Sequence, residues 1–227
     1  MKKTTLIIIA LSFIVAAQSQ TKPHFISINI GASVPIGDYG KSSSTKTDGF
    51  AKTGANFAIE GAVFINNTIG FGGYIGGNAH NIDDVAYTAE INKIPGILSS
   101  NLTADPYAIS NYMLGVYINA PASEGIFFRF KALGGSFVAK SPAMTLTFTD
   151  DNLNSDFMSL TSATGSKLAL LLGGSVLFKV SKRIGLSANL EYTGAECEFK
   201  YSTGLDTITV KQKFSIFNIT GGLNIML

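Results

Sequence analysis

The sequence predicts an all-β fold, an eight-stranded antiparallel up-and-down barrel that spans a membrane, and three observations lead to this prediction. Apolar and polar residues alternate with a period of two along eight segments, which is the periodicity of a β-strand. Charged residues make up only 14% of the chain, where about 25% is usual in soluble proteins. The connections between segments alternate between long and short, which favours an up-and-down order.

The first four strands are expected at residues 24–34, 54–65, 68–80 and 107–120. Pro35 closes the first strand, because proline lacks the N–H group that a ladder needs. Polar residues 37–53 form the first long loop. Residues 81–106 form a second, acidic loop, in which we expect a short helix at residues 89–98, broken by Pro95.

The fifth strand is expected to begin at residue 125. The sixth, seventh and eighth strands are expected at residues 164–180, 184–201 and 214–227. In the third long loop, residues 139–163, a weak alternation continues as far as Phe148, so we expect the fifth strand to project beyond the bilayer before a turn at residues 150–154. Residues 202–207 form the last loop. An even number of strands closes the sheet and leaves no edge exposed to lipid.

The N-terminus predicts a cleavable secretory signal peptide at residues 1–19. Two lysines precede an apolar run at residues 6–17, and small and polar residues follow, as in signal peptides. Residues 20–227 then form the barrel domain, with fifteen basic and fifteen acidic residues. A basic face for nucleic acid is not expected. Cys197 is the only cysteine, which excludes an intrachain disulfide and a thiolate metal cluster.

Charged residues on the predicted strands indicate which face lines the lumen. Glu60, Arg129, Lys131 and Glu191 lie on the parity opposite the isoleucines and phenylalanines. A soluble lipocalin-like barrel would instead carry many charges on its outer face. Counted from the short turns, the four residues lie at similar heights, with Arg129 slightly nearer the turns. We therefore expect a buried charge cluster that closes the lumen, with a gated solute path as the alternative.

The C-terminal strand carries a family resemblance. Ile225 and Leu227 share its apolar face, and Thr220 and Gly222 lie on its polar face. This order resembles the C-terminal signal of bacterial outer-membrane barrels, and the chain resembles the small OmpA/OmpX-type proteins, including the group labelled porin-family or PorT-like. The resemblance implies an outer-membrane location, contact with membrane lipid, insertion by the barrel-assembly machinery, and outward-facing long loops. Leu227 departs from the usual terminal Phe, and Trp is absent.

The leading functional hypothesis is a monomeric, non-enzymatic protein with a structural or surface-interaction role. It would bind an extracellular ligand through residues 37–53, 81–106 and 139–163, with no catalytic, cofactor or metal site. The acidic loop residues lack the ligand spacing of a calcium loop. The alternatives are a narrow channel for small solutes and a lipid A-modifying barrel enzyme, for which His80 with Asp83, Asp84 and a nearby serine is the only candidate.

Overall fold

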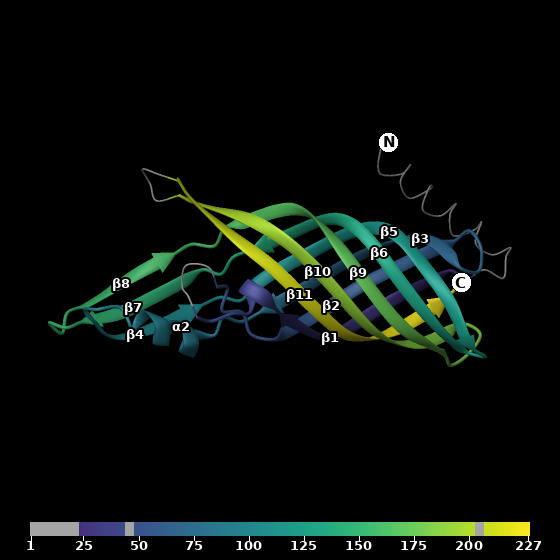
Figure 1. Cartoon of the computed structure of the whole chain (residues 1–227), viewed down its shortest axis with the longest axis horizontal. Helices are drawn as coiled ribbons and strands as arrows, with labels where there is room; N and C mark the ends of the chain where they lie inside the picture. Colours follow the sequence, from purple (N-terminus) through teal and green to yellow (C-terminus); the bar gives the residue numbers. More distant parts are fainter. Residues whose placement is uncertain (1–22, 44–47, 203–206) are drawn as a thin grey trace, which may run out of the picture.

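The computed structural model describes residues 23–43, 48–202 and 207–227, and within them eight antiparallel strands form a closed barrel (Figure 1). The order around the ring is β1, β11, β10, β9, β6, β5, β3 and β2. The predicted fold class is thus confirmed, whereas the predicted signal peptide at residues 1–19 lies outside the described residues. The barrel strands are β1 (Phe25–Pro35), β2 (Gly54–Phe64), β3 (Ile69–His80), β5 (Tyr107–Ser123), β6 (Ile126–Lys140), β9 (Thr164–Lys179), β10 (Ile184–Ser202) and β11 (Thr207–Met226).

The first and last strands close the ring. Their register runs from Phe25↔Met226 to Pro35↔Ile216, and neighbours elsewhere around the ring follow in chain order. Closure gives each wall strand a partner on both sides, which lipid cannot replace. The structure has the predicted strands within a few residues of their expected positions, with two exceptions. Strand β11 begins at Thr207, well before the expected residue 214, and β6 ends before its expected extension.

The outer face of the barrel is apolar and the inner face is polar, as the parity of the charged residues predicts. Apolar side chains of alternating residues, mostly isoleucine, leucine and phenylalanine, point outward on the wall strands, and Leu114 is 74% exposed. Buried inward positions include asparagines, serines and the four predicted charges. This polarity suits a lipid environment and contradicts a soluble lipocalin-like binder.

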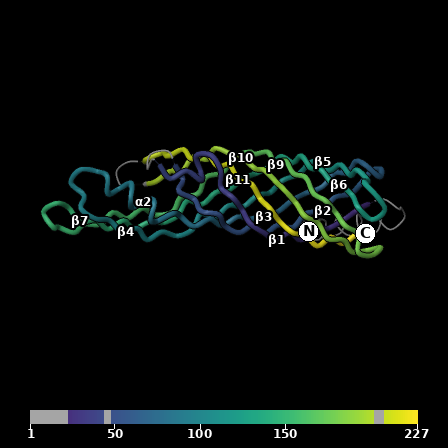
Figure 2. The backbone as a smooth tube through the Cα atoms, turned by 60° about the horizontal axis from the view of Figure 1, so that its bottom comes forward, coloured from purple at the N-terminus to yellow at the C-terminus, as the bar shows by residue number. Residues whose placement is uncertain are grey.

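A second, smaller sheet extends beyond the barrel at the end opposite the C-terminus (Figures 1 and 2). Its order is β4 (Ile97–Ala104), β7 (Met144–Asp150) and β8 (Ser155–Leu160). Helix α2 (Asp84–Ile91) packs against β4. We call this sheet and α2 the extension. Strands β10 and β11 form a separate two-stranded ribbon in the same direction, paired as far as Ser202↔Thr207.

The extension corrects three expectations within the long loops. The helix in the second loop begins earlier than residue 89, because Asp83 caps it by accepting a hydrogen bond from the Ala86 backbone N–H. Strand β4 was not expected at all. The fifth strand does not continue through residue 148: it ends at Lys140, before Pro142, and the following alternation belongs to β7 in the other sheet.

A short 3₁₀ helix, η2 (Gly37–Tyr39), follows β1 and turns the first loop into the mouth of the barrel. Gly37 has a φ of 60°, a conformation that glycine adopts without steric cost. In the described parts of the chain, no helix is long and apolar enough to cross a membrane.

Candidate functional sites in the lumen and at its mouth

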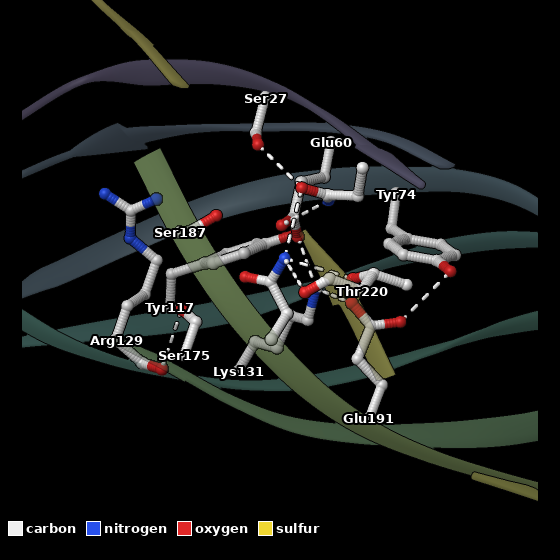
Figure 3. Close-up of polar contacts among 12 residues, drawn as sticks. Ser27, Glu60, Tyr74, Tyr117, Arg129, Lys131, Ser175, Ser187, Glu191 and Thr220 are labelled. Atoms are coloured by element: carbon white, nitrogen blue, oxygen red, sulfur yellow. Dashed lines mark hydrogen bonds and ion pairs between the residues drawn. The ribbon is translucent and has the colours of Figure 1, made fainter. Parts of the chain in front are cut away.

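Three of the four predicted lumen charges meet at the centre of the barrel (Figure 3). The Lys131 ammonium donates to Glu60 Oε2 and to Glu191 Oε1, each at 2.6 Å. The three side chains are at most 6% exposed. We call these residues the ion triad. An ion pair this deeply buried requires close geometry and further hydrogen bonds to offset its desolvation.

The backbone register explains why Lys131 and Glu191 can meet although their strands are not neighbours. Gly173 of β9 stands between them, paired with Lys131 on one side and with Glu191 on the other. A Cβ atom at Gly173 would lie 2.8 Å from Lys131 Cε and 3.3 Å from Glu191 Cγ. The absent side chain therefore provides the space in which the ion pair forms.

Neutral side chains complete the hydrogen bonds of both carboxylates. The Tyr117 hydroxyl donates to Glu60 Oε2 at 3.0 Å, and Asn29 Nδ2 donates to Glu60 Oε1 at 3.0 Å. The Tyr74 hydroxyl donates to Glu191 Oε2 at 3.2 Å. These donors come from β1, β3 and β5, so hydrogen bonds and ion pairs connect the triad to strands on both sides of the lumen.

Arg129 is buried near the ion triad but is not part of it. Its Nε donates to Asn119 Oδ1 at 2.9 Å and its Nη1 donates to Asn224 Oδ1 at 3.1 Å. The guanidinium lies 3.5 Å from the centroid of the Phe25 ring, a cation–π contact. No ion pair of Arg129 is present in the described part of the chain. The structure thus brings together three of the four expected charges and holds Arg129 with amides and a ring, nearer the short turns.

An aromatic layer lies in the other half of the lumen, toward the extension. Tyr39 of η2 is inserted among rings from the wall, with centroid separations of 4.6 Å to Phe214 and 5.3 Å to Tyr107. Phe137 and Phe199 lie 5.5 and 6.1 Å from Phe214. Tyr39 and Phe214 are fully buried. A side chain from the first loop therefore fills the mouth of the barrel.

A lone histidine at a strand end is usually solvated, but His80, the candidate base of an enzymatic site, is buried. Its Nε2 lies 3.1 Å from Ser33 Oγ, and its Nδ1 lies 3.0 Å from the Lys52 carbonyl oxygen. The carbonyl can only accept, so Nδ1 carries the proton and Nε2 accepts from Ser33. Nucleophile and base geometry is therefore present. However, both residues are fully buried, and the Tyr39 ring packs on His80 at 5.3 Å.

The aspartates proposed beside His80 lie elsewhere. Lys52 approaches Asp83 and Asp84 with N–O distances of 3.3 and 3.2 Å at the start of α2. The hydrogen bond from Lys52 lowers the pKa of the Asp84 carboxyl below its ordinary value. Backbone contacts run beside it, since the Asp83 N–H donates to the Phe50 carbonyl oxygen at 2.7 Å. These contacts hold the first loop against the extension, and we call them the latch. Because Asp83 and Asp84 contact Lys52, neither is placed to complete a catalytic triad with Ser33 and His80.

A pocket of about 220 Å³ lies above the aromatic layer. All three long loops contribute to it, through Phe50, Tyr87 and Met144, and the walls add Tyr107 and Tyr201. The Phe50 and Tyr87 rings stand 5.1 Å apart in an edge-to-face arrangement. Asp48, Ser141 and Gln212 provide polar atoms. An apolar cavity with a few convergent polar groups is the usual form of a small-molecule site.

The predicted C-terminal signal residues divide between the two faces of β11. Thr220 Oγ1 accepts a hydrogen bond from Asn189 Nδ2 at 3.1 Å inside the lumen. A Cβ atom at Gly222 would lie 2.1 Å from Asn29 Oδ1, so packing inside the lumen also requires glycine at this position. Ile225 and Leu227 point outward. Cys197 is buried in the wall near the mouth. Within the described ranges, no three His, Cys, Asp or Glu side chains are grouped to hold a metal ion.

Sequence patterns missed the aromatic layer and the pocket. The inward parity of Tyr74 and Tyr117 is visible in the sequence, but their contacts with specific carboxylates depend on the tilt of the strands. Tyr39 lies in a loop without alternation, so no local signal marks its insertion. Tyr87 lies in a helix that was expected further along the chain.

No protein-family model and no curated protein matches the chain. Among solved structures, it is similar to a major outer membrane protein from Thermus thermophilus, with 10% identity, coverage of 90% of this chain and 99% of that one, and a TM-score of 0.47. It is also similar to the outer membrane protein OprG from Pseudomonas aeruginosa, with 15% identity, coverage of 89% of this chain and 96% of that one, and a TM-score of 0.44. For Neisserial surface protein A the identity is 9%, the coverage is 90% of this chain and 97% of that one, and the TM-score is 0.46.

The closed ring of strands and the apolar outward face give the protein the architecture of a membrane-spanning β-barrel. The strands must satisfy their backbone groups within the wall because lipid offers no hydrogen bonds. The extension lies beyond the barrel end opposite the short turns.

Proposed function

We propose that the protein is a non-enzymatic outer-membrane barrel that binds a small extracellular ligand at its mouth while its lumen stays closed. The observation that carries this proposal is the pocket shared by the loops at residues 37–53, 81–106 and 139–163. Loops positioned by a rigid scaffold are the usual place for recognition. The aromatic walls favour a neutral or cationic ligand with an apolar face, of about monosaccharide size.

Two separate layers support a closed lumen. The ion triad fills the centre with charged groups that already have partners. The aromatic layer fills the mouth-side half, with Tyr39 fully buried in it. A barrel of eight strands leaves an interior that side chains can fill. A solute would therefore have to displace two independent sets of contacts.

The buried setting of Ser33 and His80 favours a structural role over catalysis. Both side chains are satisfied by each other and by the Lys52 carbonyl. A lipid A-modifying enzyme would need this pair exposed to an acyl ester. If it is structural, a fluorophosphonate serine probe leaves the folded protein unlabelled, and labelling that is lost in Ser33→Ala would support the enzyme instead.

The remaining partners of the proposal follow from the membrane setting. Lipid surrounds a single copy of the barrel, and the barrel-assembly machinery inserts it after recognising Thr220, Gly222, Ile225 and Leu227. The outward position of Ile225 and Leu227 leaves both side chains available for such recognition. Deleting residues 225–227 is expected to abolish insertion, whereas the protein refolded in detergent should still form a barrel.

The ligand proposal can be tested on the protein in lipid nanodiscs. Saturation-transfer NMR with a panel of monosaccharides and alkylated amines should find binders in the millimolar to micromolar range. Tyr87→Ala removes one pocket wall and should weaken binding about tenfold. Tyr112→Ala, which removes an exposed ring from the lipid-facing wall, should leave it unchanged. Equal binding by both variants, or none by the parent protein, would refute the proposal.

The closed lumen is tested separately in planar bilayers. The parent protein and Arg129→Ala should show no stepwise conductance, because the ion triad and the aromatic layer remain in place. Stepwise conductance in the parent protein that rises in Arg129→Ala would establish the narrow channel in its place.

A further inference from the structure

The outer wall contains a groove at the seam between β9 and β10, on the mouth side of the barrel. The ladder of these strands runs from Gly185↔Lys179 to Gly194↔Leu170. Beyond it, β9 continues to pair with β6 as far as Thr164↔Lys140, and β10 continues with β11. The groove has a volume of about 840 Å³. We call it the seam groove.

Apolar side chains form the walls of the seam groove. Leu168 is 87% exposed and Leu170 is 68% exposed, and Tyr192 faces them across the seam. Small residues line the groove on both sides of Leu170, with Gly134 of β6 on one side and Gly194 of β10 on the other, and the buried ring of Phe214 also lines it. Large walls beside these small residues give a channel that an extended hydrocarbon chain can enter, in place of a flat lipid contact.

Charged residues begin at the mouth-side end of the seam groove. Glu196 and Lys213 line it and are register partners on β10 and β11. Nearby, Glu198 is shared by two lysines at longer distances, 3.9 Å from Lys167 and 3.6 Å from Lys211. Three lysines therefore accompany two glutamates in this part of the wall. The local surplus of positive charge complements an anion.

The outward residues show that this point is a membrane boundary. Ser136 and Ser166 replace the apolar residues on β6 and β9, with their hydroxyl oxygens 3.4 Å apart. Tyr192 lies just below, where interfacial tyrosines are enriched. The apolar part of the groove therefore lies at acyl-chain depth and its lysines lie at headgroup depth.

We propose that the seam groove is a binding site for an anionic membrane lipid, with one acyl chain along the leucine walls and the phosphate at Lys213 and Lys211. The leucine walls favour a bound chain only where the groove gives it more contact than bulk lipid does. The lysines then distinguish an anionic headgroup from a zwitterionic one, because each lysine near the surface attracts anionic lipid. The site is independent of the mouth pocket.

Gly134 offers a clean way to fill the groove. A Cβ atom there would lie 3.6 Å from Leu170 Cδ2 and 3.9 Å from the Ala169 carbonyl oxygen, which is ordinary contact. Gly174 provides the matched control: its Cβ would lie 3.6 Å from Phe130 Cδ1, in a different outward hollow of about 390 Å³. Each glycine can therefore be replaced by leucine with similar local strain.

The test uses native mass spectrometry of the detergent-solubilised protein with phosphatidylglycerol and phosphatidylcholine of identical acyl chains. The parent protein should retain phosphatidylglycerol at least fivefold better. Gly134→Leu should lower this retention at least fivefold, and Gly174→Leu should not. The double variant Lys211→Glu, Lys213→Glu should retain both lipids equally, whereas Lys182→Glu at the opposite rim should keep the preference.

Heat-modifiable migration on a gel establishes that each variant is folded before retention is compared. Equal retention of the two lipids by the parent protein would overturn the proposal. So would equal retention of phosphatidylglycerol by Gly134→Leu and Gly174→Leu.

Discussion

The two halves of the lumen contain different kinds of contact. The turn-side half and the centre contain the ion triad and Arg129, held by directed hydrogen bonds from neutral side chains such as Tyr117 and Asn29. The mouth-side half contains the aromatic layer, in which Tyr39 contacts rings on several strands. Charged contacts depend on exact pairing, whereas packed rings depend on volume. The centre is therefore sensitive to a change of charge and the mouth to a change of size.

Their origins in the chain also differ. Every member of the ion triad lies on a wall strand, so the barrel alone assembles it. The aromatic layer needs η2 and the mouth pocket needs α2, which both belong to loops. The centre should thus form with the barrel, and the mouth should depend on loop folding. Three predictions test this division.

The largest effect is expected from Lys131→Met, which keeps the apolar volume of the side chain and removes its charge. Two buried carboxylates then lose the only ion-pair partner that they have among the described residues. The expected loss is about 3–5 kcal/mol of unfolding free energy. Urea unfolding in lipid vesicles, followed by circular dichroism, measures it, since the sequence has no tryptophan for fluorescence.

The triple variant Glu60→Gln, Lys131→Met, Glu191→Gln is the control for this prediction. It removes all three charges together and should recover most of the lost stability, because replacing a whole buried ion cluster is often close to neutral. If the triple variant is as unstable as the single one, the loss of stability comes from packing at the centre of the lumen and not from unpaired charge.

A smaller loss is expected from Phe214→Ala in the aromatic layer. The ring is fully buried among other aromatic rings, so its removal leaves a cavity that costs about 3 kcal/mol. Phe217→Ala is the matched control on the outward parity of the same strand, where lipid can fill the space. Equal losses in the two variants would show that the mouth side is not packed as a core.

The smallest effect concerns the latch between Lys52 and Asp84. Because the folded-state pKa of Asp84 is lowered, this contact contributes above the ordinary aspartate pKa and is lost as the pH falls through the lowered value. Both side chains are exposed, so the effect is local. Asp84→Asn should raise amide hydrogen exchange at residues 82–91 by about twofold at pH 7, and Asp105→Asn should not. If the two variants exchange at the same rate, the backbone contacts alone hold the first loop against the extension.

The sequence by itself determined the barrel, its polarity and the inward position of Glu60, Lys131 and Glu191. A period of two assigns each side chain to a face, and a closed sheet in lipid has one apolar outside. The end of β1 at Pro35 and the strand ends at the short turns were also predictable, whereas the mouth-side ends of β6 and β11 were not.

The tertiary structure alone decided which residues meet across the lumen. Strand tilt and register place Gly173 between Lys131 and Glu191, where its missing side chain leaves space for the ion pair. The parity of the residues along each strand does not contain that information. Tyr39, α2 and β4 are placed by contacts with distant segments, and their local sequences carry no clear period. Alternation fixes the face of a residue, but only the closed barrel fixes its partner.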